Sequence, residues 1–507
     1  MESAQTFVKS SKGLIKVDPC RVVGTVDDKT YSGFLEHMGR CIYEGIVDYD
    51  CKVPGLTNDK GYRLDVAKAL KDLEMPVVRY PGGNFVSSYH WMDGVGPKEN
   101  RPRRPELAWL GEESNHFGTD EFMEWCEFIG TEPYLCLNMG TGTLDEALAW
   151  LEYCNSDRNT YYANLRRKNG HEKPYNVKYW SLGNEVWGPW QVGQMTAEDY
   201  SKTAFQWAKA LKLLDPSIKL VACGCNGFSE WDYTVTQALI SQIDYYSIHD
   251  YTSSSDYYKN VTCPAAAERA IQITSKLIDL AKITQKVPNR NVKICFDEWN
   301  VWDPDRAPGH LGAEEKYTLS DAIAVAAWGN LFIRQAPHVG MANIAQCVNV
   351  IAPVMTTGTD SFLQTIYHPF LLFCKYMRGE SLNLHVEGPV YTGETGFSDH
   401  VDYMAWIKDI EPALMLLDVS ATKKDGYINI AVANRSLDED LTTSIVFEGD
   451  YQEIVTTYTV YHDDIAASNT IDNKEVVSIK EATCKFEDLK AYTFKKHSFV
   501  LLRVAIA

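Results

Sequence analysis

The chain has 507 residues, a net charge of −19 at neutral pH, 45% hydrophobic residues and 23% charged residues. This length exceeds one ordinary domain core, so we expect a large globular domain and a smaller one. A surface this negative repels phosphate backbones and anionic membranes, which argues against nucleic-acid and membrane partners.

Thirteen cysteines are scattered along the chain, and several, such as Cys136 and Cys295, lie inside apolar runs. This usage is typical of reduced core thiols, and residues 1–30 lack the apolar run of a signal peptide. We therefore expect a cytoplasmic protein; a secreted protein whose signal has been removed is the alternative. No cluster of His, Cys and acidic residues has the spacing of a metal site, so we expect no metal and no cofactor.

Short apolar runs alternate with helical patterns over the first two thirds of the chain. The runs predict eight strands, at Phe34–Cys41, Val77–Gly82, Pro133–Asn138, Val177–Gly183, Leu220–Cys223, Tyr245–His249, Val292–Asp297 and Met341–Val348. Helices are predicted between them, for example at Tyr62–Leu73, Asp120–Ile129 and Ala197–Leu214, the last with Thr196 as N-cap. This order predicts an α/β protein with a (β/α)8 TIM barrel, and an open doubly wound sheet is the competing architecture.

After about residue 385 the pattern changes to segments that alternate apolar and polar residues and are rich in Val, Ile, Thr and Tyr. These segments are Tyr427–Val432, Ser444–Phe447, Ile454–Tyr461 and Ser498–Val504. The alternation predicts an antiparallel β-sandwich. We therefore expect a catalytic barrel domain at residues 21–385 and a sandwich domain at residues 386–507.

Polar and ionisable side chains follow the apolar runs at the same end of several predicted strands. The motifs are Arg79-Tyr-Pro-Gly-Gly-Asn84, Ser181-Leu-Gly-Asn184-Glu185, Ser247-Ile-His249-Asp250-Tyr251, Phe296-Asp-Glu298-Trp299-Asn300 and Ala345-Gln346. In barrel enzymes the active site lies at the carboxyl ends of the strands, so these residues are expected to converge.

Glu185 and Glu298 point to a specific chemistry. Cleavage of a glycosidic bond needs one carboxyl group that protonates the leaving oxygen and another that attacks or activates water. A lone Glu after a strand is more often a helix cap or an arginine partner, but this pair favours a glycosidase. The acid should lie where its pKa is raised, and the nucleophile needs donors, for which Arg79 and Tyr251 are candidates. His249 could act as a base, although a role in orienting the site is simpler.

Longer motifs carry a resemblance to a known family. They are Phe34-Leu-Glu36-His-Met-Gly-Arg-Cys-Ile-Tyr43, the Arg79 motif, Lys178-Tyr-Trp-Ser-Leu-Gly-Asn-Glu-Val-Trp-Gly-Pro-Trp190, Phe296-Asp-Glu-Trp-Asn-Val-Trp302 and Ala345-Gln-Cys-Val-Asn-Val-Ile-Ala-Pro353. From about residue 30 to its end, the chain resembles the family 51 α-L-arabinofuranosidases.

The resemblance implies a retaining, exo-acting hydrolase that releases terminal arabinofuranosyl residues from arabinan, arabinoxylan or oligosaccharides. Glu185 would be the acid/base and Glu298 the nucleophile, with Tyr251 bonded to the nucleophile. The residues that would bind or border the sugar are Glu36, Asn84, Asn184, Gln346, Trp109 and Trp302, and we add His249 and Arg79 to this substrate site. The resemblance also implies a homo-oligomer such as a hexamer, and an N-terminal segment (residues 1–20) that joins the sandwich.

Two departures leave the leaving-group preference open. Glu44 stands where family members usually have a small residue, and the segment 302–317 after the nucleophile strand is short. The nearest alternative function is a retaining endo-β-glucanase or xylanase of the same clan, which would have an open cleft instead of a pocket closed by Glu36 and Asn84. A non-catalytic carbohydrate-binding protein would not need both glutamates. A nucleotide-dependent enzyme is disfavoured because Gly140-Thr-Gly142-Thr lacks the full phosphate-loop pattern.

Overall fold

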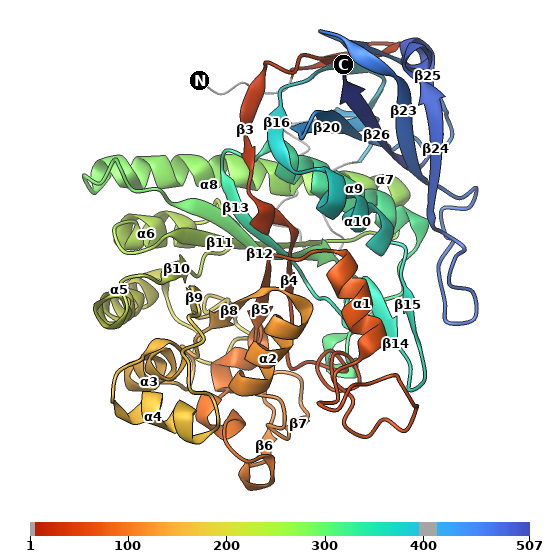
Figure 1. Ribbon diagram of the computed structural model, residues 1–507. Helices are drawn as coiled ribbons and strands as arrows, with labels where there is room; N and C mark the ends of the chain where they lie inside the picture. Colours follow the sequence, from red (N-terminus) through yellow and green to blue (C-terminus); the bar gives the residue numbers. More distant parts are fainter. Residues whose placement is uncertain (1–5, 395–412) are drawn as a thin grey trace.

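The computed structural model describes residues 6–394 and 413–507; residues 1–5 and 395–412, which belong to the predicted N-terminal segment and sandwich domain, lie outside the described residues (Figure 1). Eight parallel strands form a closed barrel. In barrel order they are β4 (Ser32–Phe34), β5 (Val77–Tyr80), β8 (Glu132–Cys136), β9 (Tyr179–Leu182), β10 (Lys219–Ala222), β11 (Tyr245–Thr252), β12 (Lys293–Val301) and β13 (Val339–Ile344). The predicted (β/α)8 barrel is confirmed, and the open sheet is excluded.

Helices surround the barrel, as Figure 1 shows for α3 to α6 and α8. Their bounds are α1 (Leu64–Asp72), α2 (Thr119–Ile129), α3 (Leu144–Asn155), α4 (Tyr161–Lys168), α5 (Ala197–Leu214), α6 (Glu230–Leu239), α7 (Tyr257–Thr262), α8 (Pro264–Thr284), α9 (Leu319–Arg334) and α10 (Tyr367–Tyr376). Helix α5 has the predicted bounds, and the Thr196 hydroxyl accepts a hydrogen bond from the Asp199 N–H as an N-cap.

The bounds of some barrel strands differ from the predicted ones for local reasons. Strand β4 ends at Phe34, not Cys41, because the chain turns out of the sheet at Glu36, whose backbone N–H bonds to the Gln346 side chain. Strands β11 and β12 extend beyond the predicted ends. Both contain a register shift, so their last residues lie in the sheet and still carry polar groups toward the site.

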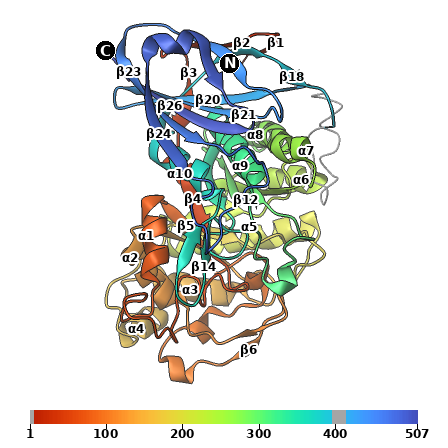
Figure 2. The same cartoon turned by 90° about the vertical axis from the view of Figure 1, so that its right-hand side faces the viewer.

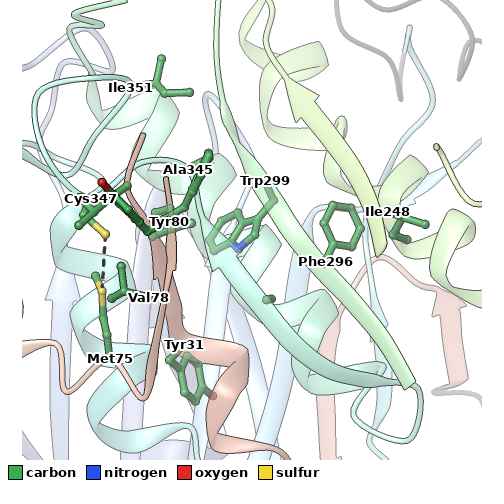
Figure 3. Close-up of a cluster of buried hydrophobic side chains, with 14 of the residues drawn as sticks. Tyr31, Met75, Val78, Tyr80, Ile248, Phe296, Trp299, Ala345, Cys347 and Ile351 are labelled. Atoms are coloured by element: carbon green, nitrogen blue, oxygen red, sulfur yellow. Dashed lines mark hydrogen bonds between the residues drawn. The ribbon is translucent and has the colours of Figure 1, made fainter. Parts of the chain in front are cut away.

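The outer face of the barrel wall carries an aromatic core. Phe296 and Trp299 of β12 lie near Ile248 of β11 (Figure 3), and their rings contact Trp328 of α9 at centroid distances of 5.3 and 5.4 Å. Helix α9 is buried on nearly all sides, as expected for a helix that is apolar all round. It lies between the barrel and the second group of sheets, so it fixes β12, the strand that carries Glu298.

The second part of the molecule consists of two larger sheets above the barrel (Figure 2). The antiparallel seven-stranded sheet has the order β24 (Ile479–Lys485), β23 (Tyr451–Val460), β26 (Ser498–Ile506), β21 (Tyr427–Asn434), β20 (Leu417–Lys424), β16 (Gly379–Leu382) and β3 (Val22–Val26). The five-stranded sheet has the order β1 (Thr6–Lys9), β17 (His385–Gly388), β2 (Gly13–Val17), β22 (Leu441–Phe447) and β25 (Tyr492–Phe494).

The N-terminal strands belong to these sheets, and two of their pairings, β1 with β17 and β2 with β22, are parallel. The remaining short strands form three two-stranded sheets: β6 (Arg104–Pro105) with β7 (Glu112–Glu113), β14 (Val354–Thr356) with β15 (Ser361–Leu363), and β18 (Val390–Tyr391) with β19 (Leu414–Met415). In the described part of the chain, the helices are all too short or too polar to cross a membrane.

A buried ion-pair group joins the barrel to the sandwich. Arg334, the last residue of α9, bonds to Glu268 of α8 at 2.6 Å and to Asp418 of β20 at 2.9 Å. Asn330 also donates to Asp418. Since all three charged side chains are largely buried, loss of the arginine would leave two carboxylates without their cation.

We therefore expect Arg334→Met to lower the free energy of unfolding by about 3–5 kcal/mol. Urea unfolding followed by tryptophan fluorescence measures this change. The control is Arg103→Met, which removes an ion pair between side chains that are 65% and 69% exposed and should leave the unfolding midpoint unchanged. Equal midpoints for the two variants would contradict a stabilising role of the Arg334 group.

Candidate active site

The sequence-predicted residues converge at the carboxyl ends of the barrel strands. Glu36 follows β4, Asn184 and Glu185 follow β9, and Gln346 follows β13. The other contributors lie within strands: Arg79 in β5, His249 and Tyr251 in β11, and Glu298 in β12. Each of these eight side chains makes a hydrogen bond to another residue of the site, and Asp297 is a further member.

The bulge in β12 explains how two consecutive carboxylates face the barrel interior. In a regular strand Asp297 and Glu298 would point to opposite faces. The register with β13 shifts between Phe296 and Trp299. As a result, Arg79 lies 3.6 Å from an Asp297 oxygen and 2.6 Å from a Glu298 oxygen.

Arg79 and Tyr251 hold Glu298 from two sides. Arg79 Nη1 donates to Oε1 at 2.6 Å, and the Tyr251 hydroxyl donates to Oε2 at 2.9 Å. Arg79 Nη2 also donates to Asn184 Oδ1 at 2.5 Å, which fixes the orientation of that amide. Arg79 is 1% exposed, so it lies beneath the site and binds protein groups.

His249 lies between three carboxylates. Its Nδ1 is 2.9 Å from Glu185 Oε1 and 3.7 Å from Glu298 Oε2, while its Nε2 is 3.0 Å from Asp297 Oδ1. Burial lowers the pKa of His249, but Glu298, Asp297 and Glu185 together raise it to about 10. The imidazole is therefore a cation at neutral pH.

Asp297 is the buried anion behind this imidazole. Tyr134 donates to its Oδ2 at 2.7 Å, and the Ser247 hydroxyl donates to Oδ1. Burial raises the pKa of Asp297, but Arg79 and His249 lower it well below its ordinary value. Asp297 is therefore ionised and fixes the histidine ring through Nε2.

Glu185 corrects one expectation. A general acid is expected to have a raised pKa, yet the pKa of Glu185 lies below its ordinary value. Burial raises it, but the hydrogen bond and charge of His249, with Trp190 and Arg79, have the larger combined effect. Trp190 Nε1 donates to Glu185 Oε2 at 2.9 Å. Glu185 also has φ of 40°, a left-handed conformation that is costly for a side chain of this kind and recurs at functional sites.

Glu36 forms a second hydrogen-bonded group opposite Glu298. Its carboxyl oxygens accept from the Phe85 N–H at 2.9 Å, from Trp109 Nε1 at 3.1 Å and from Gln346 Nε2 at 3.2 Å. Burial and the charge of Glu298 raise its pKa to about 8. Asn84 begins the 3-10 helix after β5, and its buried Oδ1 has no hydrogen-bond partner among the described residues. That oxygen is free to accept from a ligand hydroxyl.

The two predicted border tryptophans lie on neighbouring loops. Trp302 packs edge-on against Tyr251 with ring centroids 5.4 Å apart, and its Nε1 donates to the Ala307 carbonyl. Gly309 of the same loop lies against Trp109, where an added Cβ would come within 2.5 Å of the indole ring. The segment after β12 thus contacts the loop that carries Trp109.

Glu44 points away from these groups. Its side chain is 63% exposed and lies 3.7 Å from Arg40. Its φ of 64° lies in the left-handed region that favours glycine, which gives a backbone reason for a small residue at this position.

Comparisons with known proteins agree with this geometry. Residues 69–269 match the model of the "Alpha-L-arabinofuranosidase 1 domain", and residues 297–498 match the "Alpha-L-arabinofuranosidase C-terminal domain". The chain is 54% identical to alpha-L-arabinofuranosidase C of Emericella nidulans, over 98% of this chain and 99% of that protein. It belongs to the α-L-arabinofuranosidases of glycoside hydrolase family 51.

Other members of the family are similar over nearly the whole chain. The "Intracellular exo-alpha-(1->5)-L-arabinofuranosidase 1" of Bacillus subtilis is 36% identical over 92% of this chain and 93% of its own length. The α-L-arabinofuranosidase of Thermotoga maritima, solved in an arabinose complex, has a TM-score of 0.89 at 40% identity and covers 98% of this chain and 100% of its own. The GH51 enzyme of Thermotoga petrophila gives a TM-score of 0.88 at 40% identity, with 97% and 100% covered.

Sequence reasoning on this arabinofuranosidase missed two contacts. Trp190 stands in the sequence only as the end of a family motif with no assigned role, although it lies five positions after Glu185 and donates to it. Asp297 stands in the sequence only as part of a motif, and in a regular strand it would face away from Glu298. The bulge that reverses this has no clear signal in the sequence. The fold also brings one ligand atom each of Glu185, His249 and Glu298 within 4.8 Å of one another, a group that could hold a metal.

The raised pKa of Glu36 predicts a pH-dependent stability difference. Between pH 4.5 and about 8 the unfolded chain ionises this residue and the folded chain does not, so stability falls with rising pH through this window. Glu36→Gln lacks this loss and should gain about 2 kcal/mol relative to the wild type between pH 6 and pH 9. Thermal unfolding at both pH values measures the gain. Exposed Glu44→Gln serves as control, and a pH-independent difference for Glu36→Gln would refute the assignment.

Proposed function

We propose that this family 51 enzyme is a retaining, exo-acting α-L-arabinofuranosidase in which Glu298 is the nucleophile and Glu185 the acid/base. The observation that supports this most is the proximity of the two carboxyl groups in different surroundings. An oxygen of one lies within 4.8 Å of an oxygen of the other. Retaining enzymes have carboxyl groups about 5–5.5 Å apart, and inverting enzymes about 6.5–9.5 Å, to leave room for a water molecule.

The substrate class follows from the family and from the burial of the site. The Bacillus subtilis relative is named an exo-α-(1→5)-L-arabinofuranosidase, and the Thermotoga maritima relative was solved with arabinose. Here Glu36, Asn184 and Gln346 are each at most 3% exposed. A site closed by buried polar groups favours a terminal arabinofuranosyl residue of arabinan, arabinoxylan or an oligosaccharide over an internal sugar of a long chain.

In the first step, a carboxylate oxygen of Glu298 attacks the anomeric carbon while the bond to the leaving oxygen breaks. Glu185 gives its proton to that oxygen, and a glycosyl ester forms on Glu298. Arg79 and Tyr251 donate to the two Glu298 oxygens at 2.6 and 2.9 Å. These two hydrogen bonds orient the attacking carboxylate, so little reorganisation is needed in the transition state.

The proton for the leaving group is held by the pair of Glu185 and His249. In the free enzyme it rests on His249 Nδ1, 2.9 Å from Glu185 Oε1. Substrate binding removes water, which disfavours the charge-separated pair and transfers the proton to Glu185. In the second step Glu185 takes a proton from water, whose oxygen attacks the anomeric carbon and releases Glu298 and the sugar with retained configuration.

The sugar hydroxyls would be held by the groups at the barrel mouth. The free Oδ1 of Asn84 is an acceptor, and the amide nitrogens of Asn184 and Gln346 are donors. Glu36 would accept from a hydroxyl in place of one of its present donors. Trp109 and Trp302 would border the entrance.

Three further proposals concern the protein as a whole. Buried thiols, including Cys41, Cys126 and Cys136, support a reducing, cytoplasmic location, and the Bacillus subtilis relative is named intracellular. For the assembly we propose a homo-oligomer such as a hexamer, in which the exposed Phe7 and Val8 of edge strand β1 would be covered. For the domains, the pairing of β3 and β16 in the seven-stranded sheet supports a sandwich unit that begins before residue 386 and includes N-terminal residues beyond 20.

The proposed roles predict different losses for the two isosteric variants. With p-nitrophenyl α-L-arabinofuranoside, Glu298→Gln should lower kcat at least about 1,000-fold because no nucleophile remains. Glu185→Gln should lose little kcat/KM with this substrate, since the activated phenol needs little acid help in the first step, and should lose about 100-fold or more in kcat/KM with an arabino-oligosaccharide. Initial rates measure both, with exposed Glu112→Gln as the control.

Hydrolysis of only aryl β-glucosides or β-xylosides by the wild type would keep the barrel mechanism and overturn the sugar assignment. A fully active Glu298→Gln variant would exclude its role as nucleophile.

Tyr251→Phe tests the donor to the nucleophile. Loss of a hydrogen bond to a charged group costs about 1.5–3 kcal/mol, so kcat should fall about 10- to 100-fold with little change in KM. The half-exposed Tyr233→Phe is the control. A raised KM at unchanged kcat would instead assign Tyr251 to ground-state binding of the substrate.

A further inference from the structure

The catalytic carboxylates and His249 together form the donor set of a transition-metal site. One ligand atom of each of Glu185, His249 and Glu298 lies within 4.8 Å of the others. His249 Nδ1 is 2.9 Å from Glu185 Oε1 and 3.7 Å from Glu298 Oε2. Glu185 follows β9, His249 lies in β11 and Glu298 lies in β12. The three residues are far apart in the sequence, which is why no ligand spacing is visible there.

The distances suit a small divalent ion. Zinc binds imidazole nitrogen and carboxylate oxygen at about 2.0–2.2 Å, so two tetrahedral ligands lie about 3.4 Å apart. The two distances from Nδ1 lie on either side of this value. An ion placed between the three atoms would replace the proton that His249 and Glu185 now share.

The surrounding residues are arranged as metal sites require. His249 Nε2 is 3.0 Å from Asp297, which in turn accepts from Tyr134. A carboxylate behind the histidine fixes the tautomer with the other nitrogen toward the metal. The remaining carboxylate oxygens are held by protein donors: Trp190 Nε1 binds Glu185 Oε2, and Arg79 binds Glu298 Oε1.

We propose that the substrate-free enzyme binds one Zn²⁺, or a similar transition ion, through Glu185, His249 and Glu298, and that this ion inhibits hydrolysis reversibly. Three protein ligands leave a fourth position open. The ion occupies the nucleophile and the acid/base at once, so substrate and metal exclude each other. Metal binding is weakened by the nearby positive charge of Arg79 and by the need to remove a proton from His249. We therefore expect an inhibitory site and not the site of a resident cofactor.

Ligand chemistry sets the selectivity. Imidazole with carboxylates suits Zn²⁺ and Cu²⁺, while Mg²⁺ and Ca²⁺ prefer six or more oxygen ligands. The site should therefore discriminate strongly against Mg²⁺, which provides a matched control ion.

Calorimetric titration of chelator-treated enzyme with ZnCl₂, without substrate, tests the site independently of activity. We expect one Zn²⁺ per chain, at least tenfold weaker binding for Glu298→Gln and Glu185→Gln, and a 10- to 100-fold loss for Asp297→Asn. Thermal unfolding checks that each variant is folded. Cys20→Ser, which removes an exposed thiol, should bind Zn²⁺ as the wild type does.

Inhibition kinetics with p-nitrophenyl α-L-arabinofuranoside supply the second readout. Zn²⁺ should raise KM at unchanged kcat, EDTA should reverse the effect, and Mg²⁺ should have none. Unchanged Zn²⁺ binding in both glutamine variants, or a purely noncompetitive effect, would overturn the proposal. Because calorimetry needs no turnover, an enzyme that binds Zn²⁺ but does not cleave the arabinofuranoside would refute the proposed function and leave the metal site standing.

Discussion

The contacts of Arg79 are the constraint on which the site depends. This buried guanidinium binds Glu298 and Asn184, and it lies 3.6 Å from Asp297. It therefore ties β5 to β9 and β12 below the reacting groups. A buried charge is costly unless it is paired, so each carboxylate near Arg79 is both held by it and needed to balance it. The bulge in β12 is part of the same arrangement, because it turns Asp297 and Glu298 toward one cation.

His249 is the second cation, and it determines how the negative charge is shared. The two cations, His249 and Arg79, face the carboxylates of Glu185, Asp297 and Glu298. These five side chains together carry one net negative charge, a count that leaves out Glu36. The raised pKa of Glu36, caused by burial and by Glu298, is the response to that excess. The pKa of Glu185 is low because the neighbouring cation is His249, whose hydrogen bond and charge stabilise the ionised carboxylate. The proton of this pair therefore rests on the imidazole. The acid of the proposed reaction is thus the pair of Glu185 and His249. The expectation of a raised pKa applies to a single carboxyl group and does not cover such a pair.

The sequence predicts the barrel well because parallel strands covered on both faces are continuously apolar and stand out from the helical patterns. It also predicts which strand ends carry polar groups, and the motifs around Glu185 and Glu298 are long enough to identify a family. The details it misses depend on irregular backbone: strand β4 leaves the sheet at Glu36, and β12 carries its bulge between Phe296 and Trp299. The contacts of Asp297 and Trp190 follow from that geometry and not from residue type.

One measurement tests the central claim most directly: identification of a covalent intermediate. In Glu185→Gln, p-nitrophenyl α-L-arabinofuranoside should form the glycosyl ester, because the phenol leaves unaided, and hydrolyse it slowly, because the base is missing. Mass spectrometry of the quenched enzyme should then show one added arabinosyl group, located by peptide mapping on Glu298. An unmodified protein under turnover, or an ester on another carboxylate such as Asp297 or Glu36, would contradict this account.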